Sequence, residues 1–166
     1  MENKFEDQVA VVTGAASGLG MAIALKMSQK GIKLALFDKN WDGLGKTREQ
    51  LVGNNEIYLL DITNEGEVSD TVGKAYKQFE RIDILINCAE ITGTTNLLSH
   101  EVDSDNFRKV FDVNLMCSFF TSKYVLSWMV DKNYERILHI ASISGKEVNA
   151  GMPCVLLTKN CCDRYD

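Results

Sequence analysis

Short apolar runs separated by amphipathic stretches recur along this chain, and their alternation restricts its fold more than any other feature. The runs are rich in valine, leucine and isoleucine, which predicts parallel strands covered on both faces. The predicted strands are Gln8–Thr13, Lys33–Phe37, Glu56–Leu60, Asp83–Ile86 and Arg136–Ala141, and the predicted helices are Leu19–Lys30, Asp42–Val52, Asn64–Phe79 and, in one or two pieces, Asp105–Met129. Right-handed crossovers between such strands give a doubly wound α/β sheet, for which we predict the order 3-2-1-4-5.

The length and composition fit one globular domain. The chain has 166 residues, of which 45% are hydrophobic and 25% charged. Its net charge of −5 disfavours a nucleic-acid partner, because surfaces that bind nucleic acid are basic. The sequence contains no apolar run of the length that a signal peptide or a membrane span needs, so we expect no membrane association and a cytoplasmic location.

The cysteines of this chain are odd in number and show no CxxC spacing. They are Cys88, Cys117, Cys154, Cys161 and Cys162. The two histidines, His100 and His139, lie far from them in sequence and form no zinc-binding pattern with them. We therefore expect buried or incidental thiols, no disulfide framework and no metal site.

The first predicted strand leads directly into the turn TGAASGLG, residues 13–20, which opens the first predicted helix. Gly14, Gly18 and Gly20 allow a tight turn and let the backbone approach a pyrophosphate at the helix N-terminus. A glycine-rich turn also serves as an ordinary tight connection between a strand and a helix. The order strand, turn, helix and then Asp38 after the second strand favours a dinucleotide site in a Rossmann-type sheet.

Asp38 bears on the choice between NAD and NADP. A carboxylate at the end of the second strand can accept hydrogen bonds from the adenosine ribose and would repel a 2′-phosphate. The sequence therefore favours NAD over NADP, although the adjacent Lys39 works in the opposite direction. Without the glycine turn, Asp38 fits a solvated carboxylate at a strand end equally well.

Several motifs, taken together, resemble the short-chain dehydrogenase/reductase family from residue 8 to residue 159. They are GxxxGxG in the turn, LLDIT with Asp61, NCAE at residues 87–90, VFDVNLMCSF with Asn114, HIASISGKEVNAG with Ser142, and Lys159 at the lysine of the family's YxxxK motif. Taken singly, Asn114 also fits a polar residue inside a helix, and Ser142 fits a cap at the end of a strand. The joint order and spacing of the motifs make the resemblance specific.

The resemblance implies an NAD(P)-dependent oxidoreductase that transfers a hydride between nicotinamide and a small-molecule alcohol or carbonyl substrate. A tyrosine exchanges the hydroxyl proton, and a lysine one helical turn later lowers its pKa and holds the nicotinamide ribose. Ser142 would steady the substrate oxygen and Asn114 would support a water relay. The expected cofactor contacts are Gly14, Ser17, Gly18, Leu19, Gly20, Asp38, Asp61, Ile62, Asn87, Ala89 and Lys159. The family is usually homo-oligomeric, through helices that we expect to be missing here.

Two residues depart from the family pattern. Val155 stands four residues before Lys159, where the family has its tyrosine, and valine has no proton to give. Tyr165 cannot replace it, because six residues after Lys159 is another face of a helix. Removing a general acid/base lowers a rate by roughly 10² to 10⁴-fold. Glu90 replaces the glycine of the family's NNAG motif and would crowd or repel the cofactor.

These departures divide the chain, in our interpretation, into an incomplete Rossmann domain at residues 1–154 and an aberrant tail at residues 155–166. If one base is dropped from the Val155 codon, the shifted frame permits a sequence such as YSSQKTAVIGMT, which restores YxxxK and an apolar helix. We therefore expect a frame-shifted tail with no structure of its own. A short divergent C-terminus is the alternative.

Three functional hypotheses remain open from the sequence. The first is an NAD-dependent oxidoreductase by descent that is inactive, or nearly so, as this chain stands. The second is a non-catalytic nucleotide-binding remnant, and the third is a truncated gene product without function. Gly14, Gly18, Gly20 and Asp38 favour retained cofactor affinity, whereas Glu90 and the tail favour the third hypothesis.

Overall fold

Five parallel strands form the single sheet of this computed structural model, which describes residues 5–130, 134–147 and 151–162. The strands lie in the order β3-β2-β1-β4-β5, as predicted. Their bounds are β1 Val9–Thr13, β2 Lys33–Asp38, β3 Asn55–Leu59, β4 Ile84–Asn87 and β5 Arg136–His139. Because Thr13 pairs with both Phe37 and Asn87, the ends of the three central strands lie level at one edge of the sheet.

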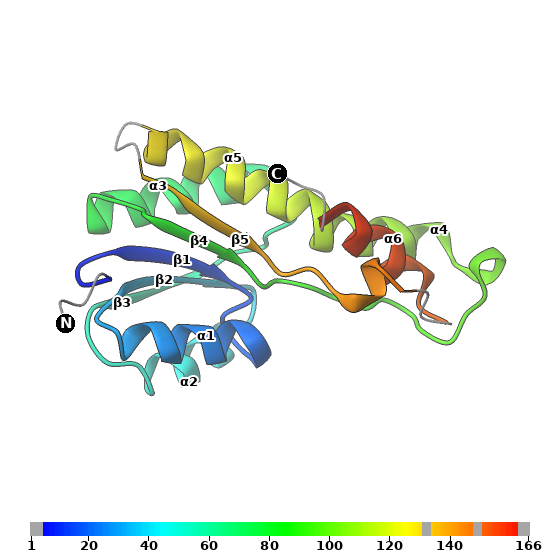
Figure 1. Cartoon of the computed structure of the whole chain (residues 1–166), viewed down its shortest axis with the longest axis horizontal. Helices are drawn as coiled ribbons and strands as arrows, with labels where there is room; N and C mark the ends of the chain where they lie inside the picture. Colours follow the sequence, from blue (N-terminus) through cyan, green and yellow to red (C-terminus); the bar gives the residue numbers. More distant parts are fainter. Residues whose placement is uncertain (1–4, 131–133, 148–150, 163–166) are drawn as a thin grey trace.

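Helices cover both faces of the sheet (Figure 1). Helices α1 (Gly18–Ser28) and α2 (Trp41–Arg48) lie on one face, and α3 (Glu65–Phe79) and α5 (Cys117–Met129) lie on the other. Successive residues of a strand point to opposite faces. Thus Ala10 and Val12 of β1 join the core under α1, whereas Val11 joins the core under α3 and α5. Burial on both faces explains why the strands are continuous apolar runs.

The expected long helix before β5 is continuous but changes its winding. Helix α4 (Ser104–Phe111) passes into a π-helical turn, η2 (Asp112–Met116), and then into α5. A π-helical turn of this kind is rare and is often found at functional sites. It carries Asn114, whose side chain is buried.

The expectation that residues 155–166 lack structure is wrong for residues 155–162. Helix α6 spans Pro153–Cys162 and therefore crosses the predicted boundary between domain and tail. Pro153 suits the first helical position, where its missing N–H is not needed. Cys154, Val155 and Thr158 form one buried face of α6, at helical spacing. This face packs against α4, η2 and the short 3₁₀ turn η4 (Ile143–Gly145), so sequence that reads as aberrant still supplies a packed helix. Tyr165 lies outside the described residues.

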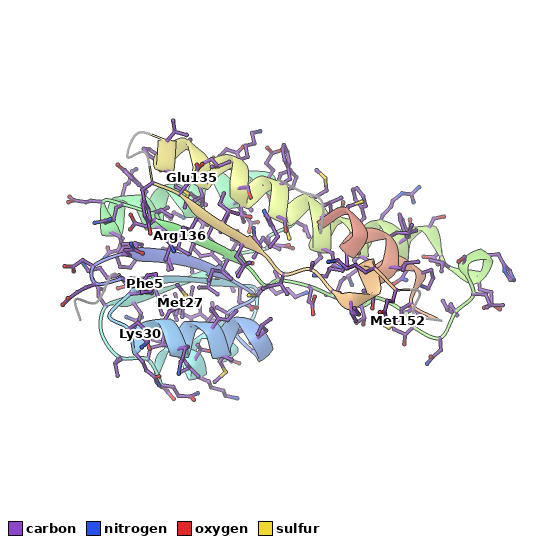
Figure 2. The ribbon with its side chains drawn as sticks, in the orientation of Figure 1. Phe5, Met27, Lys30, Glu135, Arg136 and Met152 are labelled. Carbon is purple, nitrogen blue, oxygen red and sulfur yellow. The ribbon has the colours of Figure 1, made fainter. Side chains whose placement is uncertain are left out.

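The two ends of the sheet differ in what covers them (Figure 2). At the amino end, the Arg136 guanidinium lies over the rings of Phe5 and Tyr134, at 5.9 and 5.4 Å from their centroids. Met152 and α6 lie at the opposite end, beyond the carboxyl ends of the strands. A ligand that approaches the carboxyl edge therefore meets α4, η2 and the residues packed beside α6.

Candidate active site

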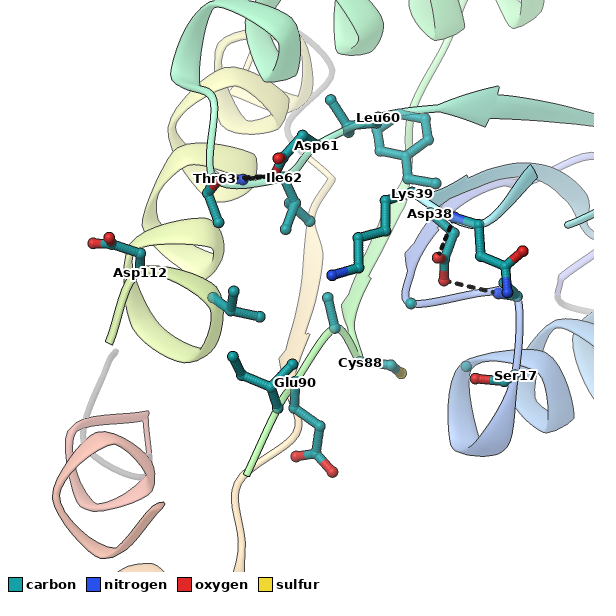
Figure 3. Close-up of a pocket in the computed structure, with 18 of the residues that line it drawn as sticks. Ser17, Asp38, Lys39, Leu60, Asp61, Ile62, Thr63, Cys88, Glu90 and Asp112 are labelled. Carbon is teal, nitrogen blue, oxygen red and sulfur yellow. Dashed lines mark hydrogen bonds between the residues drawn. The ribbon is translucent and has the colours of Figure 1, made fainter. Parts of the chain in front are cut away.

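A pocket of about 700 Å³ opens at the carboxyl edge of the sheet (Figure 3). Its walls come from the glycine turn after β1, the ends of β2 and β3, the segment after β4, and one face of α4 and η2. Ligands of doubly wound sheets bind at this edge, where neighbouring strands lead to opposite faces. The pocket therefore lies where the sequence predicts the cofactor.

The glycine turn is shaped by close backbone contacts. Gly14 has φ +66°, and a Cβ there would lie 2.9 Å from the backbone of Ala89. A Cβ on Gly20 would collide with the carbonyl oxygen of Gly14. Glycine is required at both positions, and the turn is pressed directly against the segment that follows β4.

The first turn of α1 has free backbone donors that face this pocket. Ser17 occupies the N-cap position in an extended conformation but makes no side-chain capping hydrogen bond, and the first turn carries no acidic residue. By contrast, α2 and α3 are capped by the side chains of Asn40 and Asn64. Ser17, Gly18, Leu19 and Gly20 all line the pocket. Free N–H groups at a helix N-terminus are suited to bind an anion such as a phosphate.

Asp38 lies beside the glycine turn and faces the same pocket. The Ala16 N–H donates to its Oδ2 (3.0 Å) and the Asn40 N–H donates to its Oδ1 (2.9 Å) (Figure 3). Each carboxylate oxygen has a second lone-pair site, so Asp38 can accept further hydrogen bonds from a ligand. Lys39 extends into the cavity (Figure 3) and adds a positive charge near this carboxylate.

Asp61 and Ile62 line the pocket after β3, as the resemblance implies. The Thr63 hydroxyl (2.7 Å) and the Thr63 N–H (3.0 Å) both donate to Asp61 Oδ1. These two hydrogen bonds lower the pKa of Asp61. Asp61 is therefore a fixed, ionised acceptor on this wall of the pocket.

Asn87 has a structural role beneath the pocket and, unlike Ala89, does not line it. Its Oδ1 accepts from the Thr121 hydroxyl (2.9 Å) and the Thr13 hydroxyl (3.5 Å), and its amide nitrogen contacts His139 Nδ1 (3.2 Å). The Thr13 oxygen in turn accepts from the N–H groups of Cys88 and Ala89. Asn87 thus ties the end of β4 to β1, β5 and α5.

Asn114 is also buried, and it holds the segment after β4 against the π-helical turn. Its Oδ1 accepts from the Ile91 N–H (2.9 Å), and its Nδ2 donates to the Ile91 carbonyl (3.0 Å) and to Thr158 Oγ1 (3.3 Å). Ser142 caps η4, because its Oγ accepts from the Ser144 N–H (3.2 Å). Neither Asn114 nor Ser142 lines the pocket, and the catalytic roles expected for them stay predictions.

Lys159 is buried, and its ammonium group has two partners. Nζ donates to the Ile140 carbonyl oxygen (2.7 Å) and forms an ion pair with Glu90 Oε2 (2.8 Å). Both partners line the pocket, whereas Lys159 does not. Val155, one helical turn before Lys159, is buried and also lies outside the pocket lining. The Lys159 charge is therefore neutralised behind the pocket wall.

The sequence prediction missed one wall of the pocket. It consists of Asp105, Arg108, Lys109 and Asp112 on α4 and η2. Their spacing of i, i+3, i+4 and i+7 places them on one helical face, which is a signal that the sequence already contains. This charged face becomes a candidate for ligand contact once it is known to line the same pocket as Asp38 and Asp61.

The thiols and histidines do not form a metal site in the part of the chain that the structure describes. Burial, with a smaller contribution from the Glu90 carboxylate, raises the pKa of the Cys88 thiol to about 11. Cys88 therefore stays protonated at the pocket wall, while Cys117 and Cys154 are buried. Within the described ranges, no helix is both long enough and apolar enough to cross a membrane.

The two parts of the site differ in how well they fit a dinucleotide. Free helix N–H groups, a carboxylate beside them and a cradle that a Cβ would fill all suit the adenosine diphosphate part. The nicotinamide ribose, which Lys159 would hold, does not fit, because the Lys159 ammonium is already paired with the Glu90 carboxylate.

Comparison with known proteins agrees with this geometry. The family model for short chain dehydrogenases matches residues 8–159. The chain belongs to this family. It is 34% identical over 146 residues to a 2-dehydro-3-deoxy-L-rhamnonate dehydrogenase (NAD(+)) of Sphingomonas sp. (strain SKA58).

Two solved structures of the short-chain dehydrogenase fold superpose closely on the chain. One is levodione reductase, with a TM-score of 0.92 and 27% identity over 96% of this chain. The other is NAD⁺-bound xylitol dehydrogenase, with a TM-score of 0.89 and 33% identity over 95% of this chain. The chain spans 58% of the length of the Sphingomonas relative, and 63% and 61% of the two solved chains.

Proposed function

We propose that the pocket binds NAD and that this short-chain dehydrogenase chain belongs to a line of enzymes that act on small alcohols or carbonyl compounds. The observation that carries the proposal is the free N-terminus of α1 beside the Asp38 carboxylate. The names of two relatives, one NAD⁺-bound and one specified for NAD(+), support the choice of cofactor. The proposal includes a cytoplasmic location and a family-type homo-oligomer for the whole protein.

The chain's own residues would divide the binding task among them. The N–H groups at the start of α1 would hold the pyrophosphate, and Asp38 would accept hydrogen bonds from the adenosine ribose. Ile62 would contact the adenine beside Asp61. When bound, NAD supplies hydride transfer to or from a carbinol carbon.

The residue that would exchange the hydroxyl proton of the substrate is missing from its expected position in this chain. Val155 stands where the family's tyrosine would exchange the hydroxyl proton, and its side chain is apolar and buried. The Cys88 thiol cannot serve as the base, because its pKa is raised to about 11. Loss of a general acid/base lowers a rate by roughly 10² to 10⁴-fold. We therefore propose that the chain binds its cofactor but turns over little or not at all.

A second candidate function is non-catalytic nucleotide binding. The ion pair between Glu90 and Lys159 favours it, because it removes the remaining charged catalytic residue from the pocket. Both candidates require the same adenosine site and differ in whether chemistry follows.

Calorimetric titration should show that NAD binds at least about tenfold more tightly than NADP, since Asp38 repels a 2′-phosphate that carries most of two negative charges. Asp38→Asn removes that charge but keeps an acceptor oxygen, so it should narrow the difference to about threefold or less. Asp42→Asn is the matched control, because Asp42 is exposed and lies outside the pocket. Equal or tighter binding of NADP to the unaltered chain would contradict the role given to Asp38.

A further inference from the structure

Glu90 lies on the segment that follows β4, and its backbone position is fixed. The preceding residue, Ala89, is pressed against the glycine turn, since a Cβ on Gly14 would lie 2.9 Å from its backbone. On the other side, Ile91 is held through both its N–H and its carbonyl by Asn114. The residues on both sides of Glu90 are therefore held in place, which fixes the position from which its side chain extends.

The side chain of Glu90 reaches Lys159 from the pocket side. Glu90 Oε2 lies 2.8 Å from Lys159 Nζ, and the two side chains are 53% and 4% exposed, respectively. A second donor of the ammonium is used by the Ile140 carbonyl (2.7 Å). Glu90 and Ile140 both line the pocket, so the groups that satisfy Lys159 also separate it from any ligand in the cavity.

This arrangement changes how much binding free energy a dinucleotide gains from its adenosine diphosphate part and from its second ribose. The adenosine diphosphate part meets free N–H groups of α1 and the carboxylate of Asp38. A ribose beyond the second phosphate can reach Lys159 only by displacing Glu90, which breaks an ion pair with a buried ammonium. Separating such a pair offsets the hydrogen bonds that the ribose would gain.

We propose that the site selects the adenosine 5′-diphosphate group and gains no affinity from what is attached beyond the second phosphate. This inference rests on the proposed dinucleotide site and deepens it. Its ligand class is adenosine diphosphate and its esters, and Glu90 is the residue that sets this selectivity. Lys159 then serves the structure as a buried partner of the segment after β4.

The test is calorimetric titration of ADP, ADP-ribose and NAD into the chain and into two variants. For the unaltered chain we expect dissociation constants within about threefold of one another. Glu90→Ala and Glu90→Gly free the Lys159 ammonium and should make NAD bind at least about tenfold more tightly than ADP. Both variants cost stability, because Lys159 is buried and loses its counter-charge, but its ammonium keeps the hydrogen bond to the Ile140 carbonyl and position 90 has no positive φ; a thermal melt confirms that each variant is folded before titration. Glu49→Ala, at the exposed C-cap of α2 and outside the pocket lining, is the matched control and should leave the ratio of NAD to ADP affinity unchanged.

Three outcomes would overturn the inference, and they differ in whether they also overturn the proposed function. NAD binding at least tenfold more tightly than ADP to the unaltered chain would overturn it and leave the proposed function intact. An unchanged ratio of NAD to ADP affinity in both Glu90 variants would do the same. Absence of binding by ADP, ADP-ribose and NAD alike would overturn both the inference and the proposed function.

Discussion

Gly20→Ala is expected to destabilise the chain by about 1–3 kcal/mol and to weaken NAD binding at least about tenfold. The added Cβ would collide with the carbonyl oxygen of Gly14, and its distance to the Gly14 carbonyl carbon would be 2.8 Å. The turn must then move, and with it the N–H groups of α1 that we expect to hold the pyrophosphate. At this chain length the expected fall in melting temperature is about 2–4 °C per kcal/mol.

Gly73→Ala provides the matched control for this substitution. Gly73 lies inside α3, and a Cβ there meets nothing within 4 Å. Alanine should therefore stabilise the helix by about 0.5–1 kcal/mol and leave NAD binding unchanged. Thermal melts and titrations of both variants check the pair of expectations. A Gly20 variant that melts and binds like the unaltered chain would show that the turn is not under this constraint.

Asp83→Asn is expected to lower the free energy of unfolding by about 2–3 kcal/mol. The Asp83 carboxylate is buried at the start of β4, where it accepts from the Val9 N–H (2.8 Å) and from Arg81 Nε (2.8 Å) and Nη2 (2.6 Å). An asparagine of the same shape presents an NH₂ group to donors that need an acceptor. The amide oxygen can take the Oδ2 position and still accept from the Val9 N–H and Arg81 Nε, so the expected loss comes from the buried NH₂ that then faces Arg81 Nη2 and from the lost charge.

Urea unfolding of Asp83→Asn and of Asp70→Asn measures this effect. Asp70 is an exposed residue of α3, so its amide variant should differ from the unaltered chain by less than about 0.5 kcal/mol. Since Asp83 lies at the amino end of the sheet, NAD affinity should not change in either variant once folded. A loss of stability as small as that of Asp70→Asn would mean that the buried carboxylate contributes little.

The sheet could be predicted because burial on both faces leaves a strong sequence signal. Continuous apolar runs such as those around Val11 and Ala35 would expose apolar side chains if one face of the strand met water, so they must be buried on both faces. Short crossovers then restrict the topology. Helix ends were predicted less well. Helix α2 ends at Arg48 instead of Val52, because Gln50 and Leu51 turn back through tighter bonds to Thr47 and Arg48. Such end effects depend on local hydrogen bonds that periodicity does not reveal.

The parts of the candidate site in which a local motif fixes the backbone could be predicted. The parts that depend on contacts between residues distant in sequence could not. Gly14, Gly20 and Asp38 lie where the pattern places them. The sequence shows that Glu90 is unusual but not that it pairs with Lys159, since those residues are 69 positions apart (159 − 90) and meet through packing of α6.

The tail was misjudged for a related reason. Comparison with a family motif emphasised the missing tyrosine at Val155, whereas packing of the helix requires a face that can be buried, which Cys154, Val155 and Thr158 supply. The Thr158 hydroxyl is satisfied there by the Cys154 carbonyl (2.9 Å). A shifted reading frame at codon 155 stays a prediction. Sequencing the gene through that codon tests it, and downstream code unlike any dehydrogenase would contradict it.

The most direct test of the account is to follow the backbone amide resonances of the ¹⁵N-labelled chain during titration with NAD. If the adenosine diphosphate part binds at the glycine turn, the amides of Ala16, Gly18, Asn40 and Ile62 should shift and saturate together. The amides of Tyr134 and Arg136, at the amino end of the sheet, should stay unchanged. Shifts confined to residues outside the pocket, or none at saturating NAD, would contradict a nucleotide site at the carboxyl edge of this sheet.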